Sequence, residues 1–110
     1  MAGPIISVDE LAGMIEDPAV RVVDTRWYLL EPERGGAEYA VGHLPGAVYA
    51  SLDEHLSGIT SGVPGPGRHP LPSPADFAAS MARLGIDRRH RVVAYDDRSG
   101  AIASRLWWML

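Results

Sequence analysis

Hydrophobic and polar positions along the chain follow two patterns, one typical of strands and one typical of helices. Residues 21–24, 47–50 and 91–95 are short runs rich in β-branched and apolar side chains, each bounded by polar or turn-forming residues. Such runs predict strands. The segments between them place apolar residues at helical spacing instead, which predicts helices.

The first predicted helix follows Ser7. This serine can cap the helix, and Glu10, three residues later, completes a capping box. An apolar stripe at helical spacing follows, made of Leu11, Met14 and Ile15. The Asp-Pro pair at residues 17–18 is expected to end this helix.

Another helix is predicted after Ser73, which can act as an N-cap ahead of Pro74 at the first helical position. Asp76 stands three residues after the cap. The expected buried face consists of Phe77, Ala78, Met81 and Leu84. Gly85 is a suitable C-terminal stop for this helix.

Two further helical segments are expected, a short one at residues 38–41 that ends at Gly42 and a longer one at residues 101–110. The second is still helical in pattern where the sequence stops. Its last four residues, 107–110, are apolar and lack a stop signal. We therefore expect a domain truncated at its C-terminal end, or one whose end is covered by another chain; the alternative is an amphipathic C-terminal helix that packs adequately by itself.

The alternation of strands and helices predicts an α/β fold with a parallel sheet. Active sites in such sheets lie beyond the carboxyl ends of the strands. Here those ends are residues 24–26 and 96–100. Residues 57–74 hold four glycines and five prolines, which predicts a long surface loop of a kind that is often functional.

Composition narrows the possible functions. The 110 residues suffice for one domain, and the net charge of −4 leaves no basic footprint for nucleic acid or an anionic membrane surface. No apolar run approaches the roughly 18 residues of a membrane span. The chain has no cysteine, which excludes a disulfide framework, a thiolate metal site and a thiol nucleophile within these residues.

The turn at residues 95–100 offers the first candidate for chemistry. Backbone N–H groups at such a strand-to-helix turn, together with the helix dipole, favour an anion or an activated nucleophile. The residue in that position is Asp96. A carboxylate can act as a nucleophile in phosphoryl or glycosyl transfer, but it cannot form a stable persulfide. Asp96 can equally be a helix N-cap or a turn former.

Asp24 and Arg26, at the end of the first predicted strand, are a second candidate. A carboxylate in that position commonly satisfies nearby backbone N–H groups. His43 follows the short helix and precedes the Pro-Gly turn at Gly46. It could act as an acid–base group, but a histidine at such a point more often hydrogen-bonds to the backbone and fixes the turn.

Asp53 and His69 lie sixteen residues apart, on either side of the Pro/Gly-rich loop. A carboxylate that orients an imidazole is a familiar proton relay, and the alternative is two unconnected surface residues. Glu54 and His55 add a carboxylate and an imidazole. Because the spacing of these residues is not that of metal ligands, no metal site is predicted.

Taken together, these segments resemble the rhodanese family of sulfurtransferases. Residues 23–26 and the run Glu-Tyr-Ala-Val-Gly-His-Leu-Pro-Gly-Ala at residues 38–47 are similar to the family's N-terminal signature. The resemblance makes these residues a structural motif: Asp24, Arg26, His43 and Gly46. Residues 91–96 resemble the strand that leads to the active-site loop. Residues 104–110 are similar to the next helix in the first domain of two-domain thiosulfate and 3-mercaptopyruvate sulfurtransferases.

One departure from the family is central. An active rhodanese loop opens with a cysteine that takes up sulfane sulfur as a persulfide, and this chain has Asp96 there. First domains of the two-domain enzymes typically lack that cysteine, which the second domain carries. The resemblance therefore implies that residues 1–110 are an incomplete N-terminal rhodanese-like domain, inactive alone, with the catalytic domain expected beyond residue 110.

The resemblance also implies a role for Asp53 and His69. In mercaptopyruvate sulfurtransferases, a first-domain aspartate and histidine are proposed to join a serine near the cysteine in proton transfer, and these two residues match them. The carbon left by mercaptopyruvate needs a proton, whereas thiosulfate requires none. An intact relay slightly favours mercaptopyruvate as the sulfur donor, and thiosulfate remains an alternative.

The implied function is that of the N-terminal part of a cytoplasmic thiosulfate or 3-mercaptopyruvate sulfurtransferase. Its implied partners are a small-molecule sulfur donor, a sulfur acceptor and the second rhodanese domain, without a cofactor, nucleic acid or membrane. One alternative is a non-enzymatic rhodanese-like module that binds a partner or an anion at the Asp96 turn. Another is an enzyme that uses Asp96 as an acid nucleophile, although no phosphate-cradling glycine motif or metal cluster accompanies it.

Overall fold

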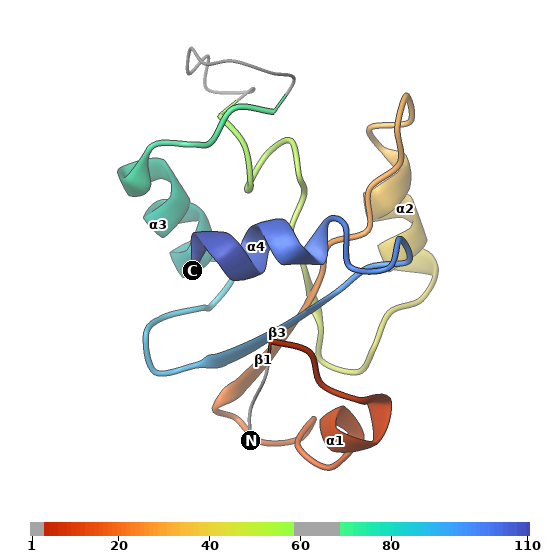
Figure 1. Ribbon diagram of the computed structural model, residues 1–110. Helices are drawn as coiled ribbons and strands as arrows, with labels where there is room; N and C mark the ends of the chain where they lie inside the picture. The colour runs from red at the N-terminus through yellow and green to blue at the C-terminus, as the bar shows by residue number, and fades with distance from the viewer. Residues whose placement is uncertain (1–3, 59–68) are drawn as a thin grey trace.

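The computed structural model describes residues 4–58 and 69–110, and these residues form a three-stranded parallel sheet (Figure 1). The strands are β1 (Val20–Asp24), β2 (Val48–Tyr49) and β3 (Arg91–Tyr95), in the order β2-β1-β3. All three predicted strands are present, although β2 has only two residues. The predicted α/β class is confirmed.

The register of the sheet brings polar side chains together at its carboxyl edge. Asp24 at the end of β1 pairs with Tyr49 on one side and with Tyr95 on the other. The next backbone amide continues the ladder, because the N–H of Thr25 donates to the carbonyl of Tyr95 at 2.9 Å. The segments that follow the three strands therefore start close to one another.

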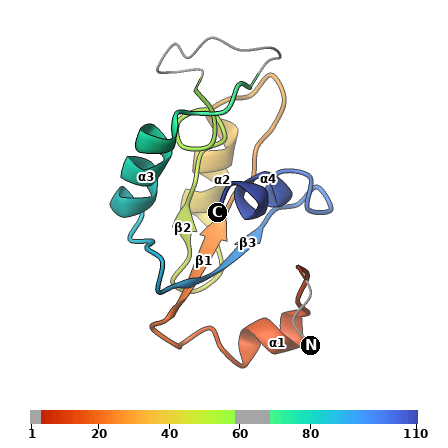
Figure 2. The same ribbon diagram turned by 60° about the vertical axis from the view of Figure 1, so that its left-hand side comes forward.

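Four helices accompany the sheet in the described part of the chain (Figures 1 and 2). They are α1 (Val8–Ala12), α2 (Arg34–Val41), α3 (Pro74–Arg83) and α4 (Ala103–Met109). The predicted capping box of α1 is present, with Ser7 and Glu10 bonded reciprocally to each other's backbone N–H groups. The helix ends at Ala12 rather than at residue 17, so the prediction of its length was wrong.

Helix α3 follows its prediction closely at both ends. The Ser73 hydroxyl accepts from the Asp76 N–H at 3.1 Å, and Gly85 takes a positive φ of 78° after the last turn. The predicted buried face needs one correction. Ala78 is exposed, and Ser80, one position before the buried Met81, takes a buried place instead.

The core has two clusters, one on each face of β1, because successive side chains of a strand point to opposite faces. Val23 packs with residues of α3 and α4, including Met81 and Leu106. Val20 and Val22 pack on the opposite side, against apolar residues of α1 and the turns after it and against Tyr39 of α2. Met14 and Ile15 thus contribute to the core from those turns, beyond the end of α1.

Helix α4 begins two residues later than predicted, after a turn at residues 101–102. The predicted loop at residues 57–74 falls largely on residues 59–68, which lie outside the described residues. Among residues 4–58 and 69–110, no helix combines the length and apolar character that crossing a membrane requires.

Candidate functional site

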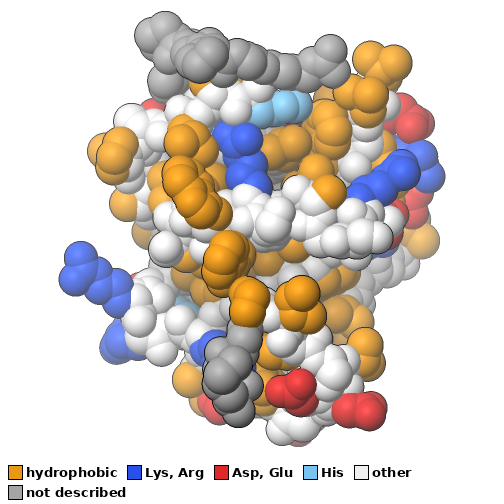
Figure 3. All heavy atoms as spheres, viewed as in Figure 1, with side chains coloured by type: hydrophobic (Ala, Val, Ile, Leu, Met, Phe, Trp, Pro, Cys, Tyr) orange, Lys and Arg blue, Asp and Glu red, His pale blue; other side chains and the backbone are white. Residues whose placement is uncertain are grey.

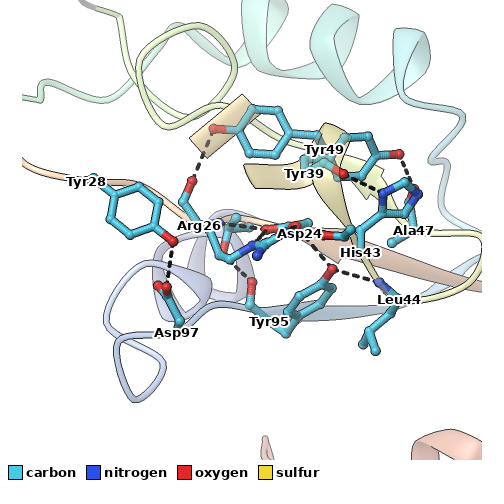
Figure 4. Close-up of polar contacts among 12 residues, drawn as sticks. Asp24, Arg26, Tyr28, Tyr39, His43, Leu44, Ala47, Tyr49, Tyr95 and Asp97 are labelled. Carbon is cyan, nitrogen blue, oxygen red and sulfur yellow. Dashed lines mark hydrogen bonds and ion pairs between the residues drawn. The ribbon is translucent and has the colours of Figure 1, made fainter. Parts of the chain in front are cut away.

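The carboxyl edge of the sheet carries a buried ion pair between Asp24 and Arg26 (Figure 4). Asp24 is fully buried, and its Oδ2 lies 2.7 Å from Arg26 Nη2. Arg26 also donates from Nη2 to the Gly42 carbonyl at 2.7 Å, and the Tyr95 hydroxyl donates to Asp24 at 3.1 Å. The hydrogen bond to Asp24 raises the pKa of the Arg26 guanidinium. Because both partners are engaged within the protein, the contacts are those of a structural anchor.

His43 lies at the next turn, where its ring stacks on Tyr39 with centroids 3.8 Å apart. Its Nδ1 lies 2.7 Å from the Tyr39 carbonyl oxygen, a contact with the backbone (Figure 4). Gly46 takes a φ of 75°, which glycine adopts without the strain that a side chain would bring. The Tyr95 hydroxyl accepts from the Leu44 N–H at 3.1 Å and ties this turn to β3.

Tyr49 links β2 to the same corner. Its hydroxyl donates to the Arg26 carbonyl at 3.1 Å. Burial raises the pKa of Tyr49 to about 12, so the hydroxyl stays protonated and can donate at neutral pH. Gly35 of α2 packs against this hydroxyl, and a Cβ at Gly35 would collide with it and with the Arg26 carbonyl.

The Asp96 carboxylate points into its own loop. Its Oδ1 accepts from the N–H groups of Arg98 and Gly100 at 2.8 and 2.9 Å, and its Oδ2 accepts from those of Ile102 and Ala103 at 2.8 Å each. Burial raises the pKa of Asp96, but the four N–H groups together outweigh burial and lower it. The carboxylate therefore satisfies the N–H groups of its own turn and of residues 102 and 103, as the turn-former alternative expects, whereas the N-cap residue of α4 is Ile102.

Asp97 makes a contact that sequence reasoning missed. The Tyr28 hydroxyl donates to its Oδ2 at 2.6 Å, which raises the pKa of Tyr28 (Figure 4). The Arg34 guanidinium lies 4.0 Å from the centre of the Tyr28 ring. Nothing in the sequence pairs residues 28 and 97, because they come together only when β1 and β3 align.

Asp53 and His69 are brought into contact. The Oδ1 of Asp53 lies 3.0 Å from the Nε2 of His69, and both side chains are largely buried, at 24% and 15% exposure. The Trp27 ring meets His69 edge-on at a centroid distance of 5.1 Å. The contact that the relay requires is thus present, while its catalytic role stays a prediction.

His69 lines an open groove of about 660 Å³ between the residue 69–71 segment and α4. Apolar side chains dominate the walls, among them Leu71, Trp107 and Trp108, which are 46%, 59% and 66% exposed. Figure 3 shows apolar side chains gathered around a histidine and an arginine on this face. The groove thus combines an imidazole, a guanidinium from Arg105 and a large apolar surface.

Glu54 and His55 do not assemble a metal site in the described residues, where no group of three His, Cys, Asp or Glu side chains is arranged to hold an ion. The Nδ1 of His55 accepts from the Ser51 N–H at 2.8 Å. Burial lowers the pKa of His55, which favours the neutral imidazole in this contact.

A family model described as a rhodanese-like domain matches residues 7–110. The chain belongs to the rhodanese-like family. A Mycobacterium tuberculosis relative named "Putative thiosulfate sulfurtransferase SseB" is 50% identical over 108 residues, or 96% of this chain. The 3-mercaptopyruvate sulfurtransferase of Escherichia coli K12 is 37% identical over 107 residues. The solved 3-mercaptopyruvate sulfurtransferase from Leishmania major matches 96% of the chain with a TM-score of 0.81 at 34% identity.

The rhodanese-like chain is much shorter than these three sulfurtransferases. The matches cover 37% of the Mycobacterium protein, 36% of the Escherichia coli protein and 28% of the Leishmania chain. The chain therefore spans about a third of the length of the curated relatives it matches. The relatives' names include both thiosulfate and 3-mercaptopyruvate as the donor.

Within this rhodanese-like domain, Arg105 is the groove residue that sequence reasoning missed. A signal was present, because Arg105 is the one charged side chain in residues 101–110. A lone arginine on an otherwise uncharged helix has to reach water or find acceptors inside the protein. Only the fold shows which acceptors it finds.

Proposed function

We propose that this rhodanese-like domain is the N-terminal part, without the cysteine nucleophile, of a sulfurtransferase that moves sulfane sulfur from thiosulfate or 3-mercaptopyruvate to a thiophilic acceptor. The observation that carries the proposal is the state of Asp96, whose carboxylate occupies the turn where an active rhodanese loop has its cysteine. The partial coverage of the relatives supports a second domain beyond residue 110 that supplies the thiol.

The proposed chemistry needs a proton for one donor only. A cysteine thiolate of the second domain attacks the sulfur of 3-mercaptopyruvate, and an S–S bond forms while the C–S bond breaks. The electron pair of that bond stays on the pyruvate carbon, which then takes up a proton. With thiosulfate, sulfite leaves with the electron pair and no carbon is protonated. Transfer of the outer sulfur to an acceptor thiolate regenerates the cysteine.

Asp53 and His69 would supply that proton. In the proposed relay, the Asp53 carboxylate accepts from the Nε2–H of His69, and Nδ1 is the ring nitrogen that exchanges a proton with the second domain. His69 lines the groove, so a proton can pass there to a group on the facing domain. This arrangement gives the first domain a direct part in turnover of mercaptopyruvate.

The same groove would receive the second rhodanese domain. Its rim exposes Trp107 and Trp108, and burying two such side chains against a partner is favourable. A small-molecule donor and acceptor would then react at the boundary between the two domains. A reducing compartment such as the cytoplasm belongs to the proposal, because the thiol must stay reduced between turnovers.

The alternatives that use the Asp96 turn receive less support. An anion-binding module needs free N–H groups at this turn, and four of them already bond to the Asp96 carboxylate. An acid nucleophile needs an oxygen that faces a substrate, and both carboxylate oxygens are engaged within the loop.

The experiment compares the two donors in the full-length protein. Asp53→Asn and His69→Ala are expected to lower kcat/KM for mercaptopyruvate by about 10²-fold, the usual contribution of a positioned acid–base group. The values for thiosulfate should change less than about threefold, since that reaction protonates no carbon. Steady-state kinetics with each donor gives the ratio of kcat/KM for mercaptopyruvate to kcat/KM for thiosulfate.

A matched control is available on an exposed turn away from the groove. The Asp87 carboxylate pairs with Arg89 at 2.8 Å and lies 3.4 Å from the Nδ1 of His90, so Asp87→Asn removes another carboxylate close to an imidazole. It should leave the donor ratio unchanged. Equal losses with both donors in the Asp53 and His69 variants would assign the pair a structural role and contradict the relay.

A further inference from the structure

The contact between Asp53 and His69 joins two segments that belong to no helix or strand. Asp53 lies in the turns after β2, and His69 is the first described residue after the gap at residues 59–68. Within residues 4–58 and 69–110, the Gly58 N–H donates to the Pro70 carbonyl at 2.7 Å and so connects the two segments. The geometry of the pair therefore depends on whatever else holds the segments in place.

Arg105 of α4 reaches both segments with a single guanidinium. Its Nε donates to the carbonyl of Leu56, three residues after Asp53, at 2.8 Å. Its Nη2 donates to the carbonyl of His69 itself, also at 2.8 Å. Because the guanidinium is rigid and planar, these two hydrogen bonds fix the distance and the angle between the two carbonyls.

The surroundings of Arg105 are unusual for a cation. No carboxylate of residues 4–58 or 69–110 lies within ion-pair distance of it. Burial lowers the pKa of its guanidinium, which reflects incomplete access to water. A partly desolvated charge without a counter-charge costs free energy unless hydrogen bonds offset the cost, and the two carbonyls provide them.

The backbone of α4 on which Arg105 stands is itself held in place. The Asp96 carboxylate accepts from the N–H groups of Ile102 and Ala103, at the start of α4. Leu106, next to Arg105, is fully buried in the main core. The backbone that carries Arg105 is thus anchored on both sides of the residue.

From these contacts we infer that Arg105 is a positioning residue that holds Asp53 and His69 at relay distance. The inference rests on the proposed function, because it concerns the same pair of residues. Arg105 acts through the two backbone carbonyls and contributes to proton transfer only by orienting His69 relative to Asp53. It differs in this from the pair, whose side chains exchange the proton.

The test replaces Arg105 in the full-length protein by methionine, which keeps an unbranched chain of similar length without donors. Arg105→Met should lower kcat for mercaptopyruvate roughly tenfold or more, since small displacements of a catalytic group cost that much. The kcat for thiosulfate should change less than twofold. Arg105→Lys, which can donate to one carbonyl at a time, should fall between wild type and Arg105→Met.

A double variant separates positioning from a general loss of structure. In a His69→Ala background, Arg105→Met should slow mercaptopyruvate turnover less than twofold further, because the relay through which it acts is already absent. Multiplied losses in the double variant, or equal losses with both donors, would overturn the inference. Arg88→Met, at an exposed position outside the groove, serves as the arginine control.

Failure of this inference and failure of the proposed function give different results. If Asp53→Asn and His69→Ala affect mercaptopyruvate selectively but Arg105→Met does not, only the positioning role is wrong. If none of the three variants separates the donors, the relay itself is wrong. A thermal melt of each variant shows whether Arg105→Met still folds, and Arg105→Lys keeps the test decisive if it does not.

Discussion

The backbone around Asp96 determines where its carboxylate points and what it binds. Four N–H groups converge on one carboxylate, and hydrogen bonds to a charged acceptor are stronger than those between neutral groups. Gly100 permits the loop to close around the side chain, because its φ of 85° lies in the left-handed region. The sequence left a nucleophile, a helix N-cap and a turn former as alternatives, and the geometry is that of a turn former.

This environment predicts a dependence of stability on pH. The four N–H groups lower the pKa of folded Asp96 below its unfolded value of about 4, so its contribution to stability is present above that pH and is lost as the pH falls through the folded pKa. Asp96→Asn should reduce the free energy of unfolding at pH 7 by about 1–3 kcal/mol, since an amide NH₂ cannot accept from the N–H groups that face it. Urea denaturation measures the change.

The change in stability at acid pH separates the variants more clearly than the value at pH 7. Below pH 4, Asp96→Asn should lose less stability than wild type, because the group that titrates is absent. Glu16→Gln, at an exposed position, removes one carboxylate elsewhere and should follow the wild-type curve. Parallel curves for Asp96→Asn and wild type would show that the N–H groups do not lower the Asp96 pKa.

At the scale of elements, α2 forms where local preference argues against it. The helix spans Arg34–Val41 and includes two glycines, whereas the sequence predicted helix only from residue 38. The reason is tertiary. Gly35 is buried against the Tyr49 hydroxyl and the Arg26 carbonyl, and the lack of a side chain there lets α2 approach β2 and the end of β1.

Adjacent glycines of α2 supply a matched pair of variants. Gly35→Ala should destabilise the protein by about 2 kcal/mol, because a Cβ there collides with the Tyr49 hydroxyl and the Arg26 carbonyl. Gly36→Ala meets only the Tyr49 ring at 3.7 Å, an ordinary contact, and should be neutral or stabilise by up to about 1 kcal/mol. Denaturation curves compare the two, and a stabilising Gly35→Ala would refute the close approach.

The starts of α1 and α3 were predictable because each follows a serine cap. The caps at Ser7 and Ser73 depend on bonds to an N–H three residues away, so the local sequence identifies them. The end of α1 at Ala12 was missed, since Met14 and Ile15 continue the apolar spacing from turns outside the helix. The same apolar spacing can therefore serve the core without continuous helix.

At the scale of the whole molecule, the groove beside α4 is the surface to which the proposed function assigns the second domain. The rim exposes Trp107 and Trp108, while His69 and Arg105 line the same groove. The chain spans about a third of the length of its curated relatives, and the thiol that the proposed chemistry needs is not among its residues.

The whole-molecule prediction is that this chain alone transfers no sulfur. It has no cysteine to form a persulfide, so thiocyanate production from thiosulfate and cyanide should equal a buffer blank. The full-length protein, treated with thiosulfate or mercaptopyruvate, should gain the mass of one sulfur that a reductant removes. Intact-mass spectrometry before and after treatment measures this gain.

Either of two results would contradict the prediction that only the full-length protein transfers sulfur. Thiocyanate above the blank from the isolated chain would assign the chemistry to residues within it. A full-length protein that gains no sulfur would favour a binding module over an enzyme.

The sequence by itself determined the α/β class, the three strands, both serine caps and the absence of a thiol, because each follows from local patterning or composition. It also proposed the partnership of Asp53 and His69, through motif resemblance. Tertiary structure alone decided that Asp96 faces its own loop, that Gly35 admits Tyr49 and that Arg105 ties the segments of the candidate relay together. For Gly35 and Arg105 the physical reason is distance along the chain, because their partners come close only when the fold aligns separate segments. For Asp96 the partners are within seven residues, and the backbone conformation of the loop decides that their N–H groups converge on one carboxylate.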